Sequence, residues 1–130
     1  MFQRIDHVEI IPSNPERTIN FYTDVLGFHI QRKMKIEAHP AVKELVFLEL
    51  NGTLIEVLSV TSPAPVTREQ WQVGYRGIAL TVDDVDKAVA YLKGKGVRIT
   101  REPISSGKSR RAEIVDPDGL PIELKQALEQ

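Results

Sequence analysis

A tight turn followed by a strand with one glutamate occurs twice in this chain, and this repeat limits the folds that the chain can adopt. The segment NGTLIEV (51–57) returns in the second half as DGLPIEL (118–124). In both copies the glutamate, Glu56 or Glu123, stands four residues after the turn glycine. Because side chains alternate along a strand, the two carboxylates leave their strands in the same register and toward the same face. The repeat therefore predicts two similar modules with matched acids.

The first half of the chain predicts a strand, a helix and three further strands. Asn14 and Pro15 suit the start of the helix, and Gly27 suits its end. The turn at residues 51–52 is Asn-Gly, which favours the type I′ geometry that matches the twist of two paired strands. The strands expected in this half cover residues 4–11, 28–35, 44–50 and 53–60.

The second half repeats that order of elements. Asp83 or Asp84 can cap a helix whose apolar residues recur at helical spacing before Gly94 and Gly96 end it. A polar loop follows the third element, and the last two strands pair across the turn 116–119, where proline and glycine hold favoured positions. The strands expected in this half cover residues 76–82, 97–101, 109–115 and 120–126.

Both halves therefore have the order βαβββ. This order predicts an α+β fold in which two tandem modules form a curved mixed sheet around a central cavity. We expect one domain over residues 1–130, with module one at 1–61, a connection at 62–75 and module two at 76–130. Two prolines mark the connection, because proline cannot donate to a strand ladder.

The composition excludes several classes of function. A net charge of −1 gives no field that would attract nucleic acid or an anionic membrane. No stretch is apolar for the roughly 18 residues that a membrane helix needs, and the first residues lack the pattern of an export signal. The chain has no cysteine, so thiolate catalysis is excluded and any metal must be bound by His, Asp or Glu. These features predict a cytoplasmic protein.

The two glutamates allow two interpretations. In the first, duplication builds a symmetric sandwich, and Glu56 and Glu123 lie on its solvated face, as polar residues on half-buried strands normally do. In the second they belong to a site, because Glu56 stands between two leucines on its face, where a buried acid is costly. His7, which shares a strand face with Glu9, can point into the same interior. One histidine and two carboxylates suit a divalent first-row cation.

Several motifs are shared with one protein superfamily. They are the paired βαβββ units, the run NPERTINFYTDVLGF (14–28), the segment DHV (6–8), and DPDG (116–119) followed by IEL (122–124). With these motifs the chain resembles the vicinal oxygen chelate superfamily, which includes glyoxalase I, methylmalonyl-CoA epimerase, extradiol dioxygenases and antibiotic-resistance proteins. The resemblance covers nearly the whole chain and is strongest to the glyoxalase-like branch.

In that branch four side chains hold the metal, one from the first strand and one from the last strand of each module. The resemblance places His7 and Glu56 of module one and Glu123 of module two at three of these positions. Gly77 takes the fourth position, where these enzymes usually carry histidine. The chain therefore departs from the pattern of the branch at one ligand.

This departure leaves three outcomes open. In the first, the metal stays on the three remaining ligands and water fills the open positions. In the second, His29 or His39, the only other histidines, supplies the missing donor, although a lone histidine on a strand edge or in a turn is usually solvated. In the third, the metal is lost and a pocket with two acids and a histidine remains.

The resemblance implies a metal-dependent lyase or isomerase of the glyoxalase type. The expected cofactor is a divalent ion, Ni, Zn, Mn or Fe, and the expected substrate is a small molecule that binds through two adjacent oxygens. Glu123 or Glu56 would take a proton from carbon and so form an enediolate-type intermediate. The alternative is a resistance-type protein that binds a small molecule without turnover. We also expect a homodimer, because symmetric dimers are the commonest oligomers.

Two further segments have open roles. The basic stretch 105–111 is expected to be a solvated loop, with contact to an anionic group of the substrate as the alternative. Trp71 lies in the connection and is expected either to cover the pocket or to pack against the edge of the sheet.

Overall fold

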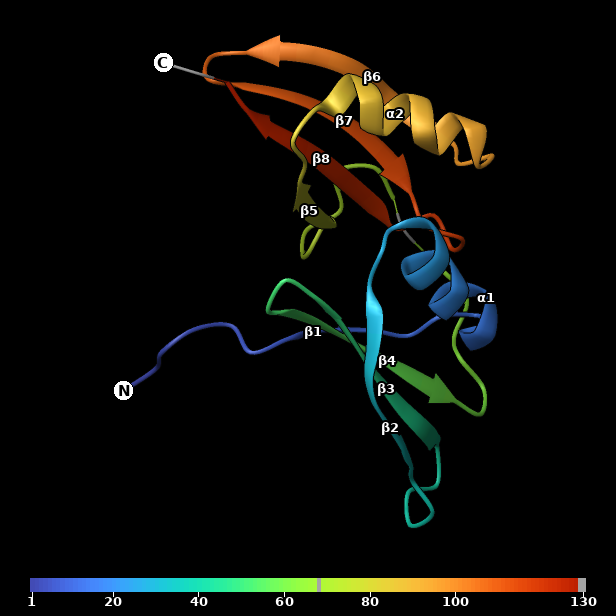
Figure 1. Cartoon of the computed structure of the whole chain (residues 1–130). Helices are drawn as coiled ribbons and strands as arrows, with labels where there is room; N and C mark the ends of the chain where they lie inside the picture. Colours follow the sequence, from blue (N-terminus) through green and yellow to red (C-terminus); the bar gives the residue numbers. More distant parts are fainter. Residues whose placement is uncertain (68, 129–130) are drawn as a thin grey trace. The chain divides into compact units, whose positions relative to one another are not determined.

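The computed structural model describes residues 1–67 and 69–128, and the chain divides into two compact units, Met1–Val66 and Thr67–Gln130. Each unit contains one four-stranded sheet and few helices (Figure 1). The predicted α+β class and the two βαβββ modules are confirmed. The exact limits given to the modules and to the connection stay a prediction. No helix in the described part of the chain is long and apolar enough to cross a membrane.

The sheet of module one has the strand order β1-β4-β3-β2. It is mixed, because β1 runs parallel to β4 and the other neighbours are antiparallel. Asn51 and Gly52, between β3 and β4, both have positive φ (46° and 85°), as the predicted type I′ turn requires. The strands are β1 (Val8–Ile10), β2 (His29–Lys35), β3 (Val42–Leu50) and β4 (Thr53–Val60). Only β1 is much shorter than predicted, because it pairs over three residues.

The helix of module one begins as predicted and changes its hydrogen-bonding pattern before it ends. Asn14 caps α1 (Pro15–Asn20), and its side chain accepts a hydrogen bond from the backbone N–H three residues later at 3.1 Å. A π-helical turn, η1 (Phe21–Val25), continues the helix. Within it the buried Tyr22 packs edge-on against Phe28, with 5.7 Å between the ring centroids. This contact fixes the end of the helix to the core of its own module.

The sheet of module two repeats the topology with the order β5-β8-β7-β6, in which β5 runs parallel to β8. Asp84 caps α2 (Val85–Gly94), and its Oδ1 accepts a hydrogen bond from the backbone N–H of Lys87 at 3.1 Å. The helix lies against β6, β7 and β8 (Figure 1). The strands are β5 (Ile78–Thr81), β6 (Ile99–Ser106), β7 (Ser109–Val115) and β8 (Pro121–Ala127).

The segment 105–111 is not the solvated loop that was predicted. β6 continues to Ser106, and a two-residue turn leads directly into β7. Pro103 concealed this strand in the sequence, because proline has no N–H for the ladder. In the structure the register of β6 on β7 shifts around Pro103, which leaves the proline unpaired at the edge of the sheet. The prediction was wrong because an edge strand tolerates a proline at a bulge.

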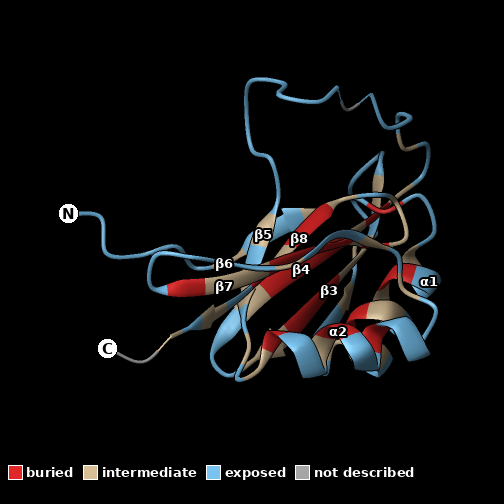
Figure 2. Cartoon of the chain, turned by 90° about the horizontal axis from the view of Figure 1, so that it is seen from above, coloured by how far each residue is buried: buried red, intermediate tan, exposed pale blue. Residues whose placement is uncertain are grey.

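Each module has its own apolar core. Figure 2 shows buried residues along the central strands and on part of each helix. The buried apolar side chains are Tyr22, Phe28, Val46, Phe47, Leu48, Ile55 and Val57 in module one, and Val85, Val89, Leu92, Ala112, Ile114, Ile122 and Leu124 in module two. The core of module one contains three aromatic residues, whereas that of module two is entirely aliphatic.

Candidate functional site

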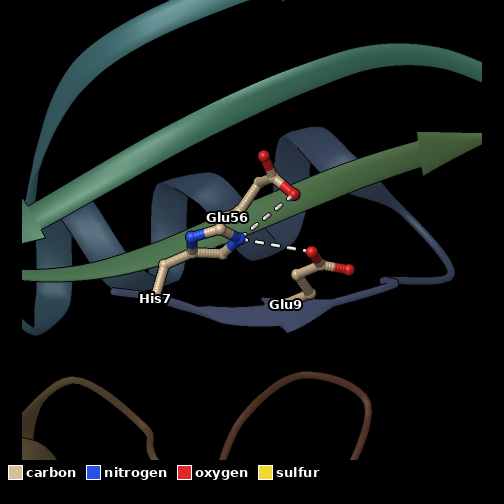
Figure 3. Close-up of side chains that lie close together, drawn as sticks. All are labelled: His7, Glu9 and Glu56. Carbon is tan, nitrogen blue, oxygen red and sulfur yellow. Dashed lines mark hydrogen bonds and ion pairs between the residues drawn. The ribbon is translucent and has the colours of Figure 1, made fainter. Parts of the chain in front are cut away.

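Three neighbouring strands of module one place two acids and an aromatic ring in one row. The parallel register aligns Glu9 of β1 with Glu56 of β4. The antiparallel register aligns Glu56 with Phe47 of β3. His7 stands two residues before Glu9, so the alternation of side chains puts both on the same side of the chain. Figure 3 shows the ring of His7 beside the carboxylates of Glu9 and Glu56.

His7 is the centre of this cluster. Its Nε2 lies 3.2 Å from Oε2 of Glu9 and 3.8 Å from Oε1 of Glu56. Its Nδ1 lies 2.9 Å from Oδ2 of Asp6. When Nδ1–H donates to Asp6, the lone pair of Nε2 faces the two glutamates and is available to a cation. An edge-on contact with Phe47, at 5.6 Å between ring centroids, also orients the imidazole.

Glu56 is a buried acid with only 7 % of its surface exposed. In the described part of the chain its carboxylate accepts no hydrogen bond, and its nearest polar partner is Nε2 of His7 at 3.8 Å. Burial, and after it the charge of Glu9, raises the pKa of Glu56 above its ordinary value. The interpretation that Glu56 lies on a solvated face is therefore wrong.

The electrostatics of the cluster favour a positive charge at its centre. The hydrogen bonds with Asp6 and then with Glu9 raise the pKa of His7 above its ordinary value. The same contact with His7 lowers the pKa of Asp6. Three carboxylates thus surround one imidazole, and either a proton or a metal ion can supply the compensating charge.

The donor set fits a divalent first-row cation. Imidazole nitrogen and carboxylate oxygen are the ligands that such ions take from a chain without cysteine. One ligand atom each from His7, Glu9 and Glu56 lies within 4.8 Å of the other two. Atoms bound to Zn²⁺ at about 2.1 Å in tetrahedral geometry lie about 3.4 Å apart, so a small closure of the side chains is sufficient.

The corresponding row of module two has different chemistry. The register aligns Ala79 of β5 with Glu123 of β8, and Glu123 with Glu113 of β7. Nη1 of Arg76 lies 2.8 Å from Oε2 of Glu113, and Nη1 of Arg111 lies 3.5 Å from Oε1 of Glu123. Two arginines therefore compensate two glutamates in this module. Glu123 takes the position that Glu56 has in module one, and its role as a ligand stays a prediction.

Gly77 takes the position that His7 has in module one. Two residues after His7, Glu9 pairs with Glu56 of β4, and two residues after Gly77, Ala79 pairs with Glu123 of β8. This equivalent pairing confirms the predicted alignment of the modules. A Cβ at Gly77 would collide with the backbone carbonyl oxygen of Pro121. The position therefore accepts no side chain, histidine included, unless the backbone moves.

The other two histidines lie outside the cluster. Nε2 of His29 pairs with Oε1 of Glu49 at 2.8 Å. Nδ1 of His39 accepts hydrogen bonds from two backbone N–H groups of its own turn, at 3.0 Å each. Within residues 1–67 and 69–128, the group of His7, Glu9 and Glu56 is the one that could hold a metal ion, and neither His29 nor His39 belongs to it.

The arginines of the basic stretch and Trp71 have partners within module two. Arg110 forms two hydrogen bonds with Asp86, at 2.8 and 2.9 Å, and these bonds link β7 to α2. Trp71 is 73 % exposed, and the guanidinium of Arg76 lies over its ring at 5.7 Å from the centroid. Whether Trp71 covers the pocket or packs against the edge of the sheet stays a prediction.

Glu9 is the member of the cluster that sequence reasoning did not assign to the site. The signal was present, because Glu9 follows His7 by two residues and so shares its strand face. The family pattern includes only one ligand from the first strand of a module, so it does not predict Glu9 as a ligand.

Comparison with known proteins decides the family. The model of the Glyoxalase/Bleomycin resistance protein/Dioxygenase superfamily matches residues 4–124. The chain belongs to this superfamily. Members of the superfamily are generally metal-dependent and bind small substrates.

Three similar proteins illustrate the range of the superfamily. The uncharacterized protein YaeR of Escherichia coli K12 is 34 % identical, over 94 % of this chain and 95 % of its own length. Lactoylglutathione lyase of Escherichia coli O157:H7 is 32 % identical, over 93 % of this chain and 90 % of its own length. The solved structure of the trypanothione-dependent glyoxalase I of Leishmania major has a TM-score of 0.78 and 31 % identity, with coverage of 96 % and 87 %. The relatives with a named activity support a lyase- or isomerase-type role within the superfamily.

Proposed function

We propose that this protein is a metal-dependent lyase or isomerase of the glyoxalase type, which acts on a small substrate with two adjacent oxygens. The observation that carries the proposal is the contact between His7 and the buried Glu56 in module one, at 3.8 Å. Glu123 at the equivalent position of module two and the similarity to a lactoylglutathione lyase support it. The ion would be Ni²⁺, Zn²⁺, Mn²⁺ or Fe²⁺.

The residues of the site would have different roles in such a reaction. His7, Glu56 and Glu123 would hold the ion, which when bound supplies a Lewis acid that stabilises negative charge on the oxygens of the substrate. Asp6 keeps the imidazole of His7 in the orientation that directs Nε2 into the site. Phe47, 9 % exposed, lies beside Glu56 in the row and limits the access of water to that side.

Proton transfer is the task of a carboxylate. Glu123 or Glu56 takes a proton from the carbon next to the substrate carbonyl, which gives an enediolate-type intermediate, and the proton then returns to the adjacent carbon. The side chain of Glu123 is 30 % exposed and that of Glu56 is 9 % exposed, so Glu123 is the more accessible base. Nη1 of Arg111 lies 3.5 Å from Oε1 of Glu123 and can hold this carboxylate in position.

The first test is the metal content of protein purified without chelator or His-tag. We expect one divalent ion per chain by mass spectrometry of the digested protein. His7→Ala and Glu123→Gln should each weaken binding, and Glu56→Gln should abolish turnover of lactoylglutathione in either direction. Failure of wild-type protein to bind any of the four ions would sink the metalloenzyme proposal.

A second candidate is a protein that binds a small molecule without turnover. The observation that favours it is Gly77, because this position offers no ligand and its contact with Pro121 leaves no room for one. Saturable binding of a glutathione conjugate with no turnover at any metal loading would support this candidate. Turnover that requires added metal would exclude it.

We also propose that the protein is a homodimer in the cytoplasm. Symmetric dimers are the commonest oligomers, and the absence of cysteine suits a reducing compartment. Light scattering of the purified chain should give twice the mass of 14.6 kDa. A monomer at micromolar concentration would contradict the dimer.

A further inference from the structure

We propose that Glu9 is a metal ligand, so that module one supplies three ligands by itself and makes up for the histidine that module two lacks at Gly77. This inference rests on the proposed function for the presence of a cation and adds the identity of the ligand. It assigns a role to an acid outside the family pattern of one ligand per terminal strand. Three observations on the structure carry it.

The first observation is the difference in charge between the two rows. Each row contains two glutamates on neighbouring strands, Glu9 and Glu56 in module one and Glu123 and Glu113 in module two. In module two, arginines form ion pairs with both glutamates. In the described part of module one, the only ion-pair partner of Glu9 and Glu56 is His7. Asp6 has a second partner in Arg4 at 3.8 Å, and Arg32 acts on Glu56 through its charge without forming an ion pair. His7 is thus the only cation in contact with the two glutamates in the described part of module one, so this row has room for a further positive charge.

The second observation is the state of Glu56. Its side chain is more than nine-tenths buried and points toward His7 and Glu9 (Figure 3). In the described part of the chain this carboxylate accepts no hydrogen bond. A buried carboxylate without a donor is costly, because burial removes the water that would otherwise solvate it. An ion between Glu9 and Glu56 would satisfy the buried oxygens directly.

The third observation is the freedom of Glu9 to bind. The backbone of Glu9 is fixed in β1 opposite Glu56, so its position in the row does not depend on the loop before the strand. Its side chain is 57 % exposed, and its one polar contact in the described chain is Nε2 of His7 at 3.2 Å. An ion can therefore enter from the solvent side, and Glu9 can turn toward it without losing another partner. In module two the equivalent residue is Ala79, which cannot bind a metal.

The competing explanation is that His7 is an imidazolium ion that holds the three acids by hydrogen bonds alone. That arrangement uses the same contacts and needs no metal. The two explanations differ in what Glu9 does to a bound ion. If Glu9 is a ligand, its removal changes both the affinity and the coordination of the ion, whereas removal of an acid elsewhere in module one changes neither.

The experiment uses the full chain and two probes, Ni²⁺ by isothermal titration and Co²⁺ by its visible absorption spectrum. The variant is Glu9→Gln, which keeps the size of the side chain and removes its charge. The matched control is Glu37→Gln, which removes one charge from an exposed residue of the same module, outside the cluster. Glu123→Gln and the double variant Glu9→Gln/Glu123→Gln show what module one contributes alone.

We expect Glu9→Gln to weaken Ni²⁺ binding at least about 10-fold and to alter the Co²⁺ spectrum, with Glu37→Gln equal to wild type. Glu123→Gln should keep one Ni²⁺ per chain at reduced affinity, and the double variant should lose it. An affinity of Glu9→Gln within about twofold of the control, with an unchanged Co²⁺ spectrum, overturns the inference.

The outcomes also separate this inference from the proposed function. Metal-dependent turnover of lactoylglutathione together with unchanged binding in Glu9→Gln would leave the enzyme proposal standing and refute the role of Glu9. Weakened binding in Glu9→Gln without turnover by wild type would support Glu9 as a ligand and refute the enzyme. Wild-type protein that binds neither Ni²⁺ nor Co²⁺ refutes both.

Discussion

Replacement of Gly77 by alanine tests the steric argument about the missing ligand. Gly77 does not have a left-handed backbone, so alanine causes no strain in φ and the only cost is the collision of its Cβ with the carbonyl oxygen of Pro121. Overpacking of this kind costs about 1 to 3 kcal/mol. At about 2.1 cal/mol/K of unfolding entropy per residue, a chain of 130 residues has about 0.27 kcal/mol/K. The expected fall in Tm is therefore about 4 to 11 °C.

Urea denaturation followed by circular dichroism measures this cost, and Gly94→Ala is the matched control. Gly94 is the last residue of α2, and a Cβ there meets no atom within 4 Å. Alanine is a better helix former than glycine, so the control should be neutral or more stable by up to about 1 kcal/mol. If Gly77→Ala is as stable as wild type, the position has room for a side chain and the steric reasoning is wrong.

Three further predictions concern the same position, the helix caps and a buried acid of module two. Gly77→His should lose stability as Gly77→Ala does and should not tighten Ni²⁺ binding in titration calorimetry; tighter binding would show that the backbone yields. Asn14→Ala and Asp84→Ala should each cost about 1 kcal/mol in urea, because each removes a helix N-cap; no loss in either would contradict the cap geometry. Burial alone would raise the pKa of Glu113, but the hydrogen bonds from Arg76 and Thr100 outweigh it and lower the pKa from its ordinary 4.5. The ionised form therefore adds stability above about pH 4.5 that is lost as pH falls through the lowered pKa, and acid titration of Glu113→Gln between about pH 5 and 3 should show a smaller loss than wild type.

The repeat in the sequence predicted most of the fold because each signal was local. The Asn-Gly turn and the caps at Asn14 and Asp84 each depend on a few neighbouring residues, and the structure confirms them. The extent of β6 was predicted wrongly for the opposite reason. Pro103 is a local signal against a strand, and the bulge that accommodates it depends on pairing with β7, which a window of sequence does not contain.

The site was predictable only in part for a related reason. Glu56 was found through the repeat and His7 through its strand face, the family pattern placed both among the ligands, and the structure brings them together. Glu9 joins them because the parallel register places it opposite Glu56. The register between two strands that are distant in sequence cannot be predicted from either strand alone. The compensation of Glu123 by Arg111 is likewise a consequence of which strands are neighbours.

The bulged outer strands of the two sheets bear on how the protein avoids aggregation. β2 and β6 each end a sheet, and such an edge exposes unpaired N–H and C=O groups that can recruit another chain. β2 breaks its ladder between Ile30 and Arg32 and continues with two lysines, while β6 carries Pro103 between its paired residues. Neither edge strand therefore presents a long, regular row of backbone hydrogen-bonding groups to another protein chain. The irregularities that made these strands hard to predict therefore also disfavour pairing of these edges with the strands of another chain.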